Sequence, residues 1–124
     1  MGYGLHITRA DNWLDSETVP ITADEWLELV NNDPELRIKS PNGKYFAKWA
    51  GPGSFPDPWF DWSDGQIHTK NPRRRELGKM LQIASRLDAK VQGDDGEIYA
   101  KIEDMPSDEE FEKVTRPWWK VWGG

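Results

Sequence analysis

Several short stretches of the chain alternate apolar and polar residues at every second position, which is the pattern of a strand with one buried face. The clearest lies in residues 3–10, where Tyr3, Leu5 and Ile7 alternate with glycine, histidine and threonine. Further stretches, separated by turn signals such as Ser-Asp-Gly and Gly-Asp-Asp-Gly, predict more strands. These lie at residues 36–39, 45–49, 59–62, 66–70, 90–92 and 97–99.

A first helix is predicted directly after Thr22. The Thr22 hydroxyl is suited to cap the helix, and Glu25 completes a Thr-x-x-Glu capping box. Ile21 and Trp26 have the spacing of a hydrophobic staple across this helix start. Pro34 disfavours helix in the residue before it, so the helix is expected to end within Asn-Asn-Asp at 31–33.

A second helix is predicted to begin at Asn71-Pro72, with Asn71 as its cap. Its inward stripe comprises Leu77, Met80, Leu81, Ile83, Ala84 and Leu87. The order β-α-β-β-β-β-α-β-β predicts a single α+β domain over residues 1–124, mostly an antiparallel sheet with two helices packed on one face. For the tail, residues 100–124, the pattern indicates only a helical turn at 108–113 and assigns no packing.

The core must depend on indole rings. Leu, Ile, Val and Phe together make up only 24 of the 124 residues, whereas the chain contains eight Trp. Each aromatic side chain buries roughly 150–250 Å², so the Trp residues supply the apolar surface that the aliphatic residues lack. Eight indoles exceed what so small a core can hide, and some are expected at a groove or an interface.

The formal net charge of −6 and the absence of cysteine exclude several functional classes. A chain of this charge is repelled by phosphate backbones and anionic bilayers, so neither nucleic acid nor a membrane is an expected partner. Without cysteine there are no disulfides, no thiolate catalysis and no cysteine-based metal sites. No apolar run has the length of a membrane helix and no signal-peptide pattern opens the chain, so a cytoplasmic protein is expected.

Acidic residues concentrate late in the chain. Residues 94–112 contain nine acids and one base. The general interpretation is a set of solvated loops and a polar helix face. The more specific one is a docking surface for a basic partner, where charge raises the association rate and selects against wrong partners. The residues expected to bind such a partner are Asp61, Asp64, Asp94, Asp95, Glu97, Asp104, Trp118, Trp119 and Trp122.

Other clusters indicate chemistry only weakly. The basic cluster at residues 70–79 suits either an anion site at a helix start or pairing with acids of the same chain. His6 and His68 lie on predicted strands, where a histidine is more often structural than catalytic. No phosphate-binding fingerprint occurs, and residues 94–97 lack the alternating oxygen ligands of a calcium loop, so neither cofactor nor metal is expected.

The aromatic segment around residues 49–64 supports an alternative function. Trp49, Trp59 and Trp62 lie close in sequence to carboxylates at positions 57, 61 and 64. Two carboxylates beside aromatic platforms are the arrangement of a sugar-binding or glycoside-cleaving site. The alternative is therefore a small-ligand-binding module or an enzyme that uses an aromatic pocket around these three Trp residues.

Residues 3–99 also resemble a group of small, acidic, stand-alone bacterial proteins. The resemblance rests on four stretches: Leu-His-Ile-Thr-Arg at 5–9, Pro-Trp-Phe-Asp-Trp-Ser-Asp-Gly at 58–65, Lys-Asn-Pro at 70–72 and Gly-Asp-Asp-Gly-Glu-Ile-Tyr at 93–99. The group includes immunity proteins of toxin–immunity systems, among them those of contact-dependent growth inhibition. The resemblance implies a non-enzymatic protein that binds a cognate toxin, such as a basic nuclease domain, and neutralises it by occluding its active site.

Overall fold

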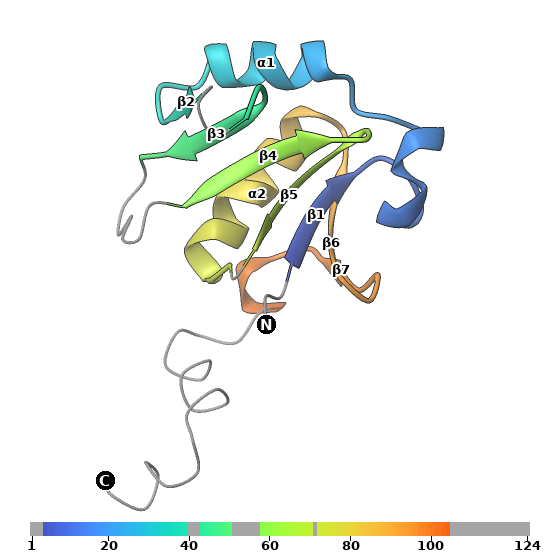
Figure 1. Cartoon of the computed structure of the whole chain (residues 1–124). Coiled ribbons are helices and arrows are strands. Elements are labelled where there is room, and N and C mark those ends of the chain that lie inside the picture. The colour runs from blue at the N-terminus through green and yellow to red at the C-terminus, as the bar shows by residue number, and fades with distance from the viewer. Residues whose placement is uncertain (1–3, 40–42, 51–57, 71, 105–124) are drawn as a thin grey trace, which may run out of the picture.

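The computed structural model describes residues 4–39, 43–50, 58–70 and 72–104 (Figure 1). The strands are β1 (Gly4–Thr8), β2 (Leu36–Ile38), β3 (Phe46–Trp49), β4 (Trp59–Ser63), β5 (Gln66–Lys70), β6 (Lys90–Gly93) and β7 (Ile98–Tyr99). The α-helices are α1 (Ala23–Asn31) and α2 (Arg74–Arg86), and the short 3-10 segments are η1 (Trp13–Thr18) and η3 (Ile102–Asp104). Within these residues the order of strands and α-helices is the one predicted from the sequence.

The strands form a seven-stranded sheet in the order β2-β3-β4-β5-β1-β6-β7. Every pairing is antiparallel. The N-terminal strand β1 lies inside the sheet, where His6 is opposite His68 of β5 on one side and Gln92 of β6 on the other. The first strand of the chain therefore joins the meander β2–β5 to the C-terminal hairpin β6–β7.

Both α-helices cover the same face of this sheet, as the order of the elements predicted. Leu5 and Ile7 of β1 are fully buried and face the helices. Trp26 of α1 and Met80 of α2 are also fully buried in the same core. Figure 1 shows α2 passing behind the central strands and α1 running along β3 and β4. No α-helix of the described residues lies on the opposite face of the sheet, and the side chains of that face form the surface considered below.

The predicted start and end of α1 are confirmed. The Thr22 hydroxyl accepts a 3.1 Å hydrogen bond from the Glu25 N–H, and the Glu25 carboxylate accepts one of 3.0 Å from the Thr22 N–H. Ile21 and Trp26 are both fully buried on either side of the cap. The helix ends at Asn31, as the proline at position 34 predicted.

The prediction for the start of α2 was wrong by two residues. The helix begins at Arg74 with Arg73 as its N-cap, and the Glu76 carboxylate accepts a 2.7 Å hydrogen bond from the Arg73 N–H. Glu76, at the third helical position, thus accepts the hydrogen bond of the free backbone N–H at the N-cap. The sequence had instead predicted that the helix is capped further upstream, by Asn71. Asn71 lies outside the described residues, as do the turn at 108–113 and the rest of the tail after 104.

A buried ion cluster fixes α2 against the loop that follows α1. Lys79 is 5% exposed, and its Nζ lies 2.7 Å from Asp33 Oδ2 and 2.9 Å from Glu35 Oε1. Burial acts to raise the pKa of Asp33, but hydrogen bonds from Lys79 and from the Glu35 N–H outweigh it, and the pKa lies below its ordinary value. Arg86 Nη1, 3.1 Å from Asp33 Oδ2, completes the cluster.

We expect Lys79→Met to cost about 3 kcal/mol of unfolding free energy, because it leaves the buried Asp33 carboxylate without its closest cation. Urea unfolding measures this cost. The double variant Asp33→Asn/Lys79→Met should cost less than the sum of its two single variants. Glu28→Gln, on the exposed side of α1, is the control and should change stability by less than about 0.5 kcal/mol. If the cost of the double variant equals the sum of the two single costs, Asp33 and Lys79 are not energetically coupled.

Candidate functional site

The helix-free face of the sheet gathers polar and aromatic side chains from five strands. Phe46, Asp61, His68, His6 and Gln92 are successive cross-strand neighbours from β3 to β6. Their sequence neighbours Ala47, Phe60, Ile67 and Ile7 are buried in the core on the other side of the sheet. The two-residue period of each strand therefore places the histidines on a face with no α-helix over it.

The segment η1 covers one end of this face. The Trp13 indole is stacked on the His6 ring with a centroid separation of 3.8 Å and an angle of 1° between the planes. The Trp13 N–H donates a 2.7 Å hydrogen bond to Gln92 Oε1, and the indole N–H donates one of 3.2 Å to the Asp94 carbonyl. The buried Ser16 hydroxyl lies 2.8 Å from the Thr8 hydroxyl. These contacts hold η1 to β1 and to the β6–β7 hairpin.

Both ring nitrogens of His6 have hydrogen-bond partners in this arrangement. Nδ1 lies 2.7 Å from Gln66 Oε1, and Nε2 lies 2.9 Å from Asp94 Oδ1. The other Asp94 oxygen accepts a 2.9 Å hydrogen bond from the Gly4 N–H. Burial acts to raise the pKa of Asp94, but the bonds from His6 and Gly4 outweigh it and lower that pKa. His6 thus links β1, β5 and the β6–β7 hairpin, and it cannot act as a base on an external group without losing one of these bonds.

His68 is the more accessible histidine of the face. Its ring meets the edge of Trp59 at a centroid distance of 5.9 Å. Burial lowers the pKa of His68, and the neighbouring Asp61 carboxylate opposes this only in part. The arrangement therefore favours the neutral imidazole, whose polar edge is suited to hydrogen bonding in a recognition surface.

Along the side of the face occupied by η1, seven exposed carboxylates lie on three segments that contact η1 or its neighbours. We call this the acidic surface. It comprises Asp11, Asp15 and Glu17 near η1, Asp64 in the β4–β5 turn, and Asp94, Asp95 and Glu97 in the β6–β7 hairpin. Contacts fix the segments relative to one another: Gln92 Nε2 donates to the Asp11 carbonyl, and the β4–β5 turn packs on the backbone at Ser16 and Pro20. Segments 11–19 and 94–98 contain no basic residue.

Large apolar side chains are exposed on the same surface. Leu14 is 72% exposed and Val19 49%, both in or beside η1, and Ile98 of β7 is 54% exposed. Only one other large hydrophobic side chain is exposed in the described part of the chain, Ile102 in η3. Exposed apolar side chains on the same segments as exposed charges are typical of a protein-binding surface.

Four of the nine residues predicted to bind a partner are in the acidic surface: Asp94, Asp95 and Glu97 in the β6–β7 hairpin, and Asp64 in the β4–β5 turn at the other end of the strands. Asp61 lies at the centre of the sheet face, between Phe46 and His68, rather than in the acidic surface. Asp104 lies in η3, which packs against α2, and its carboxylate accepts a 2.7 Å hydrogen bond from the Ala100 N–H. Trp118, Trp119 and Trp122 lie outside the described residues.

Sequence reasoning missed the contribution of residues 11–19. The segment has no helical or two-residue period, so no face could be assigned to it. The available signal was the combination of three acids, no base and two unpatterned apolar residues, Leu14 and Val19. Its position beside the β6–β7 hairpin depends on the Trp13 contacts, which the sequence did not reveal.

The three Trp residues of the alternative interpretation do not line one pocket. Trp49 is 6% exposed on the helix-covered side, where its indole N–H donates to Glu35 Oε1 at 3.0 Å. Trp62 packs against the core, and its indole N–H donates to the Ile21 carbonyl at 2.8 Å. Trp59 lies on the opposite, helix-free face. Two shallow grooves, one between α1 and β2 and one between the C-terminal ends of α1 and α2, both lie on the helical side.

The basic cluster at residues 70–79 is divided by the fold. Lys79 is buried in the ion cluster, and Arg75 Nε lies 2.7 Å from Glu76 Oε2. Lys70 and Arg73 remain exposed at the end of β5 and at the start of α2. The interpretation as intramolecular pairing therefore applies to part of the cluster only.

Comparisons with protein-family models, with curated proteins and with solved structures find no match to this chain. Among the described residues, no helix has the length and apolar character to cross a membrane. Functional reasoning therefore depends on the geometry above.

The lowered pKa of His68 predicts a pH-dependent stability. Because the unfolded chain binds a proton at this histidine more readily than the folded protein, His68 contributes stability at pH 7.5 that is lost as the pH falls below about 6.5. The free energy of unfolding, measured with urea at pH 7.5 and at pH 5.0, should decrease less between these two pH values for His68→Gln than for the unsubstituted protein. Equal losses in the two proteins would contradict this role of His68.

Proposed function

We propose that the protein is a non-enzymatic inhibitor of the immunity type, which binds a basic partner protein through its acidic surface. The observation that supports it is the coincidence of seven exposed carboxylates with three exposed apolar side chains around η1. Within the described residues Asp94 is bonded to His6 and Gly4, and Asp11 Oδ1 lies 3.9 Å from Lys90 Nζ. No ion pair in that part of the chain involves the other five carboxylates, and no contact there covers the three apolar side chains. A basic partner with an apolar recess would satisfy both.

The two components have different physical roles. Leu14 projects from a short segment whose backbone is held to the sheet by Trp13, so its burial costs little additional ordering. A few apolar side chains that become buried supply most of the affinity of an interface. The surrounding carboxylates attract a basic partner, accelerate encounter and disfavour acidic competitors.

The partner that fits best is a toxin domain with a cationic substrate site. Nucleases position Lys and Arg side chains on phosphate groups, and a rigid array of carboxylates pairs with those cations. Bound there, the acidic surface would block access of the nucleic acid to the active site. The resemblance to immunity proteins described above supports the same partner class.

The direct test is isolation of the partner. The tagged protein, expressed with the product of the adjacent upstream reading frame, should form a one-to-one complex at 0.15 M salt that weakens at 0.5 M salt as charges are screened. Expressed alone, that product should stop cell growth, and co-expression of this protein should restore it. A stable complex with a harmless partner, or no complex at either salt concentration, would contradict the inhibitor function.

Substitutions should separate the two components of binding. Leu14→Ser should weaken the complex about 30-fold or more, mainly through faster dissociation. Asp15→Lys/Asp95→Lys should instead slow association about tenfold or more. Surface plasmon resonance with the purified partner measures both rates.

A matched control is available on the helical side. Glu28→Lys/Glu103→Lys makes the same change in net charge at exposed positions of α1 and η3. This variant should retain most of the association rate of the unsubstituted protein. An equal loss in control and test variants would assign the effect to net charge and not to the acidic surface.

A further inference from the structure

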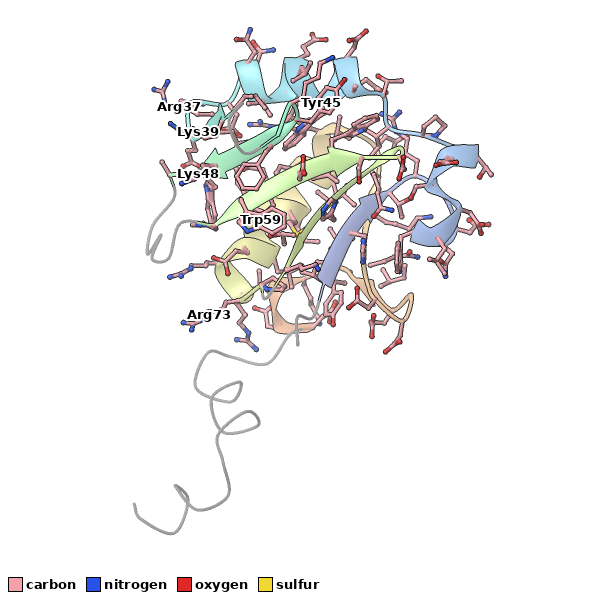
Figure 2. All side chains as sticks on the ribbon, in the orientation of Figure 1. Arg37, Lys39, Tyr45, Lys48, Trp59 and Arg73 are labelled. Carbon is pink, nitrogen blue, oxygen red and sulfur yellow. The ribbon has the colours of Figure 1, made fainter. Side chains whose placement is uncertain are left out.

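We propose that the other end of the helix-free sheet face is a binding site for single-stranded nucleic acid. The site is the cationic–aromatic patch, formed by Arg37, Lys39, Phe46, Lys48, Trp59 and Lys70. Figure 2 shows Arg37, Lys39 and Lys48 at the edge formed by β2 and β3, with Trp59 beside them on β4. The site goes beyond the inhibitor function and does not depend on it.

The aromatic part of the patch is a ready platform for bases. Phe46 and Trp59 are stacked with a centroid separation of 5.2 Å and 25° between their planes, and the His68 ring abuts Trp59. All three side chains are half-buried, so their positions are fixed while part of each ring faces solvent. Aromatic side chains on an open antiparallel sheet can stack two or three unpaired bases.

The cations form a row that crosses the strands beside these rings. Arg37 is opposite Lys48, and Lys48 is opposite Trp59. The register that pairs Asp61 with His68 brings Lys70 opposite Trp59 on the other side. The row from β2 to β5 extends over roughly 14 Å, at about 4.8 Å between neighbouring strands. Exposed Arg73, at the start of α2, lies at the same end of the sheet (Figure 2).

The net charge of −6 argued against nucleic acid as a partner, but the fold separates the charges. Asp64 lies at the end of β4 opposite Trp59, roughly 13 Å or more away along the strand. Asp94 instead lies beside Gly4, which is opposite Lys70, so the patch and the acidic surface come closest at Lys70. Lys48 on β3 and Arg37 on β2 are four and five strand spacings from β6, roughly 19 Å or more. The Debye length at physiological salt is about 8 Å, so the acids are largely screened from a strand bound at the β2–β3 edge.

One acidic residue, Asp61, lies inside the site and should make it prefer some bases over others. Asp61 neighbours Phe46 and His68 on the same face. A carboxylate repels phosphate but accepts hydrogen bonds from exocyclic amino groups, such as N4 of cytosine. A base stacked on the Phe46–Trp59 platform would present its edge toward Asp61, so amino-bearing bases should bind better than thymine.

The test is fluorescence anisotropy with a labelled 12-nucleotide oligo-dC, with oligo-dT, oligo-rC and a 12-base-pair duplex as parallel arms. Oligo-dC should bind more tightly than oligo-dT and than the duplex, and comparison with oligo-rC tells whether DNA or RNA is preferred. For three phosphate contacts the logarithm of the affinity should fall by about 2 per tenfold increase in salt. Trp59→Ala should weaken binding about 5- to 150-fold, the effect of losing one stacked base.

Three further variants keep the test independent of the Trp59 packing. Arg37→Glu/Lys39→Glu, at exposed positions of the sheet edge, should weaken binding to every sequence and reduce the salt slope by about 0.7 for each phosphate that the variant no longer neutralises. Asp61→Asn should reduce the preference for oligo-dC over oligo-dT. Lys101→Glu, near η3 on the helical side, should bind as the unsubstituted protein does.

The circular dichroism spectrum establishes that each variant is folded. The proposal is overturned if oligo-dC does not bind, if the duplex binds as well as the single strand, or if Lys101→Glu weakens binding as much as Arg37→Glu/Lys39→Glu. A patch variant that no longer binds the oligonucleotide but still inhibits the partner protein shows that this site is separate from the inhibitor function. A variant that binds the oligonucleotide but no longer inhibits the partner shows the same.

Discussion

The structure depends on one constraint: within the described residues, both α-helices cover the same face of the sheet. In each strand the side chains that point toward α1 and α2 must be apolar, and those that point the other way are free of that requirement. Leu5 and Ile7 are apolar and fully buried on the helix-covered face, while His6 between them points to the other face. The candidate chemistry of the chain therefore collects on a single surface because the core occupies the other one.

That surface is divided by η1, which closes over one end of it. Stacking of Trp13 on His6 and the bond from Trp13 to Gln92 fix the segment without an α-helix. The covered end becomes acidic and presents Leu14, whereas the uncovered end keeps its aromatic rings and cations. Net charge alone hides this division, because the sum of −6 combines two regions of opposite sign.

Local features of the fold could be predicted from the sequence, and distant ones could not. The capping box at Thr22 and the turn at 63–65 involve residues within a few positions of one another, so their chemistry is visible in the sequence. The pair Lys79–Asp33 joins residues 46 positions apart, and His6–Asp94 joins residues 88 apart. The candidate site is built from contacts between residues that are far apart in the sequence. Its strand residues were placed on the correct face by their period, but their neighbours on other strands were not predictable.

The central claim is that opposite charges are sorted to two sides of one sheet face, with the cations toward the β2–β3 edge and the acids toward η1 and the β6–β7 hairpin. The most direct measurement is a two-dimensional NMR spectrum of the indole N–H groups, recorded with two probes in turn: a short oligolysine peptide and a single-stranded oligonucleotide. The account predicts that oligolysine shifts the Trp13 resonance and leaves Trp59 in place, and that the oligonucleotide does the reverse. The account would be contradicted if both probes shifted the resonance of the same indole, or if no probe shifted either resonance.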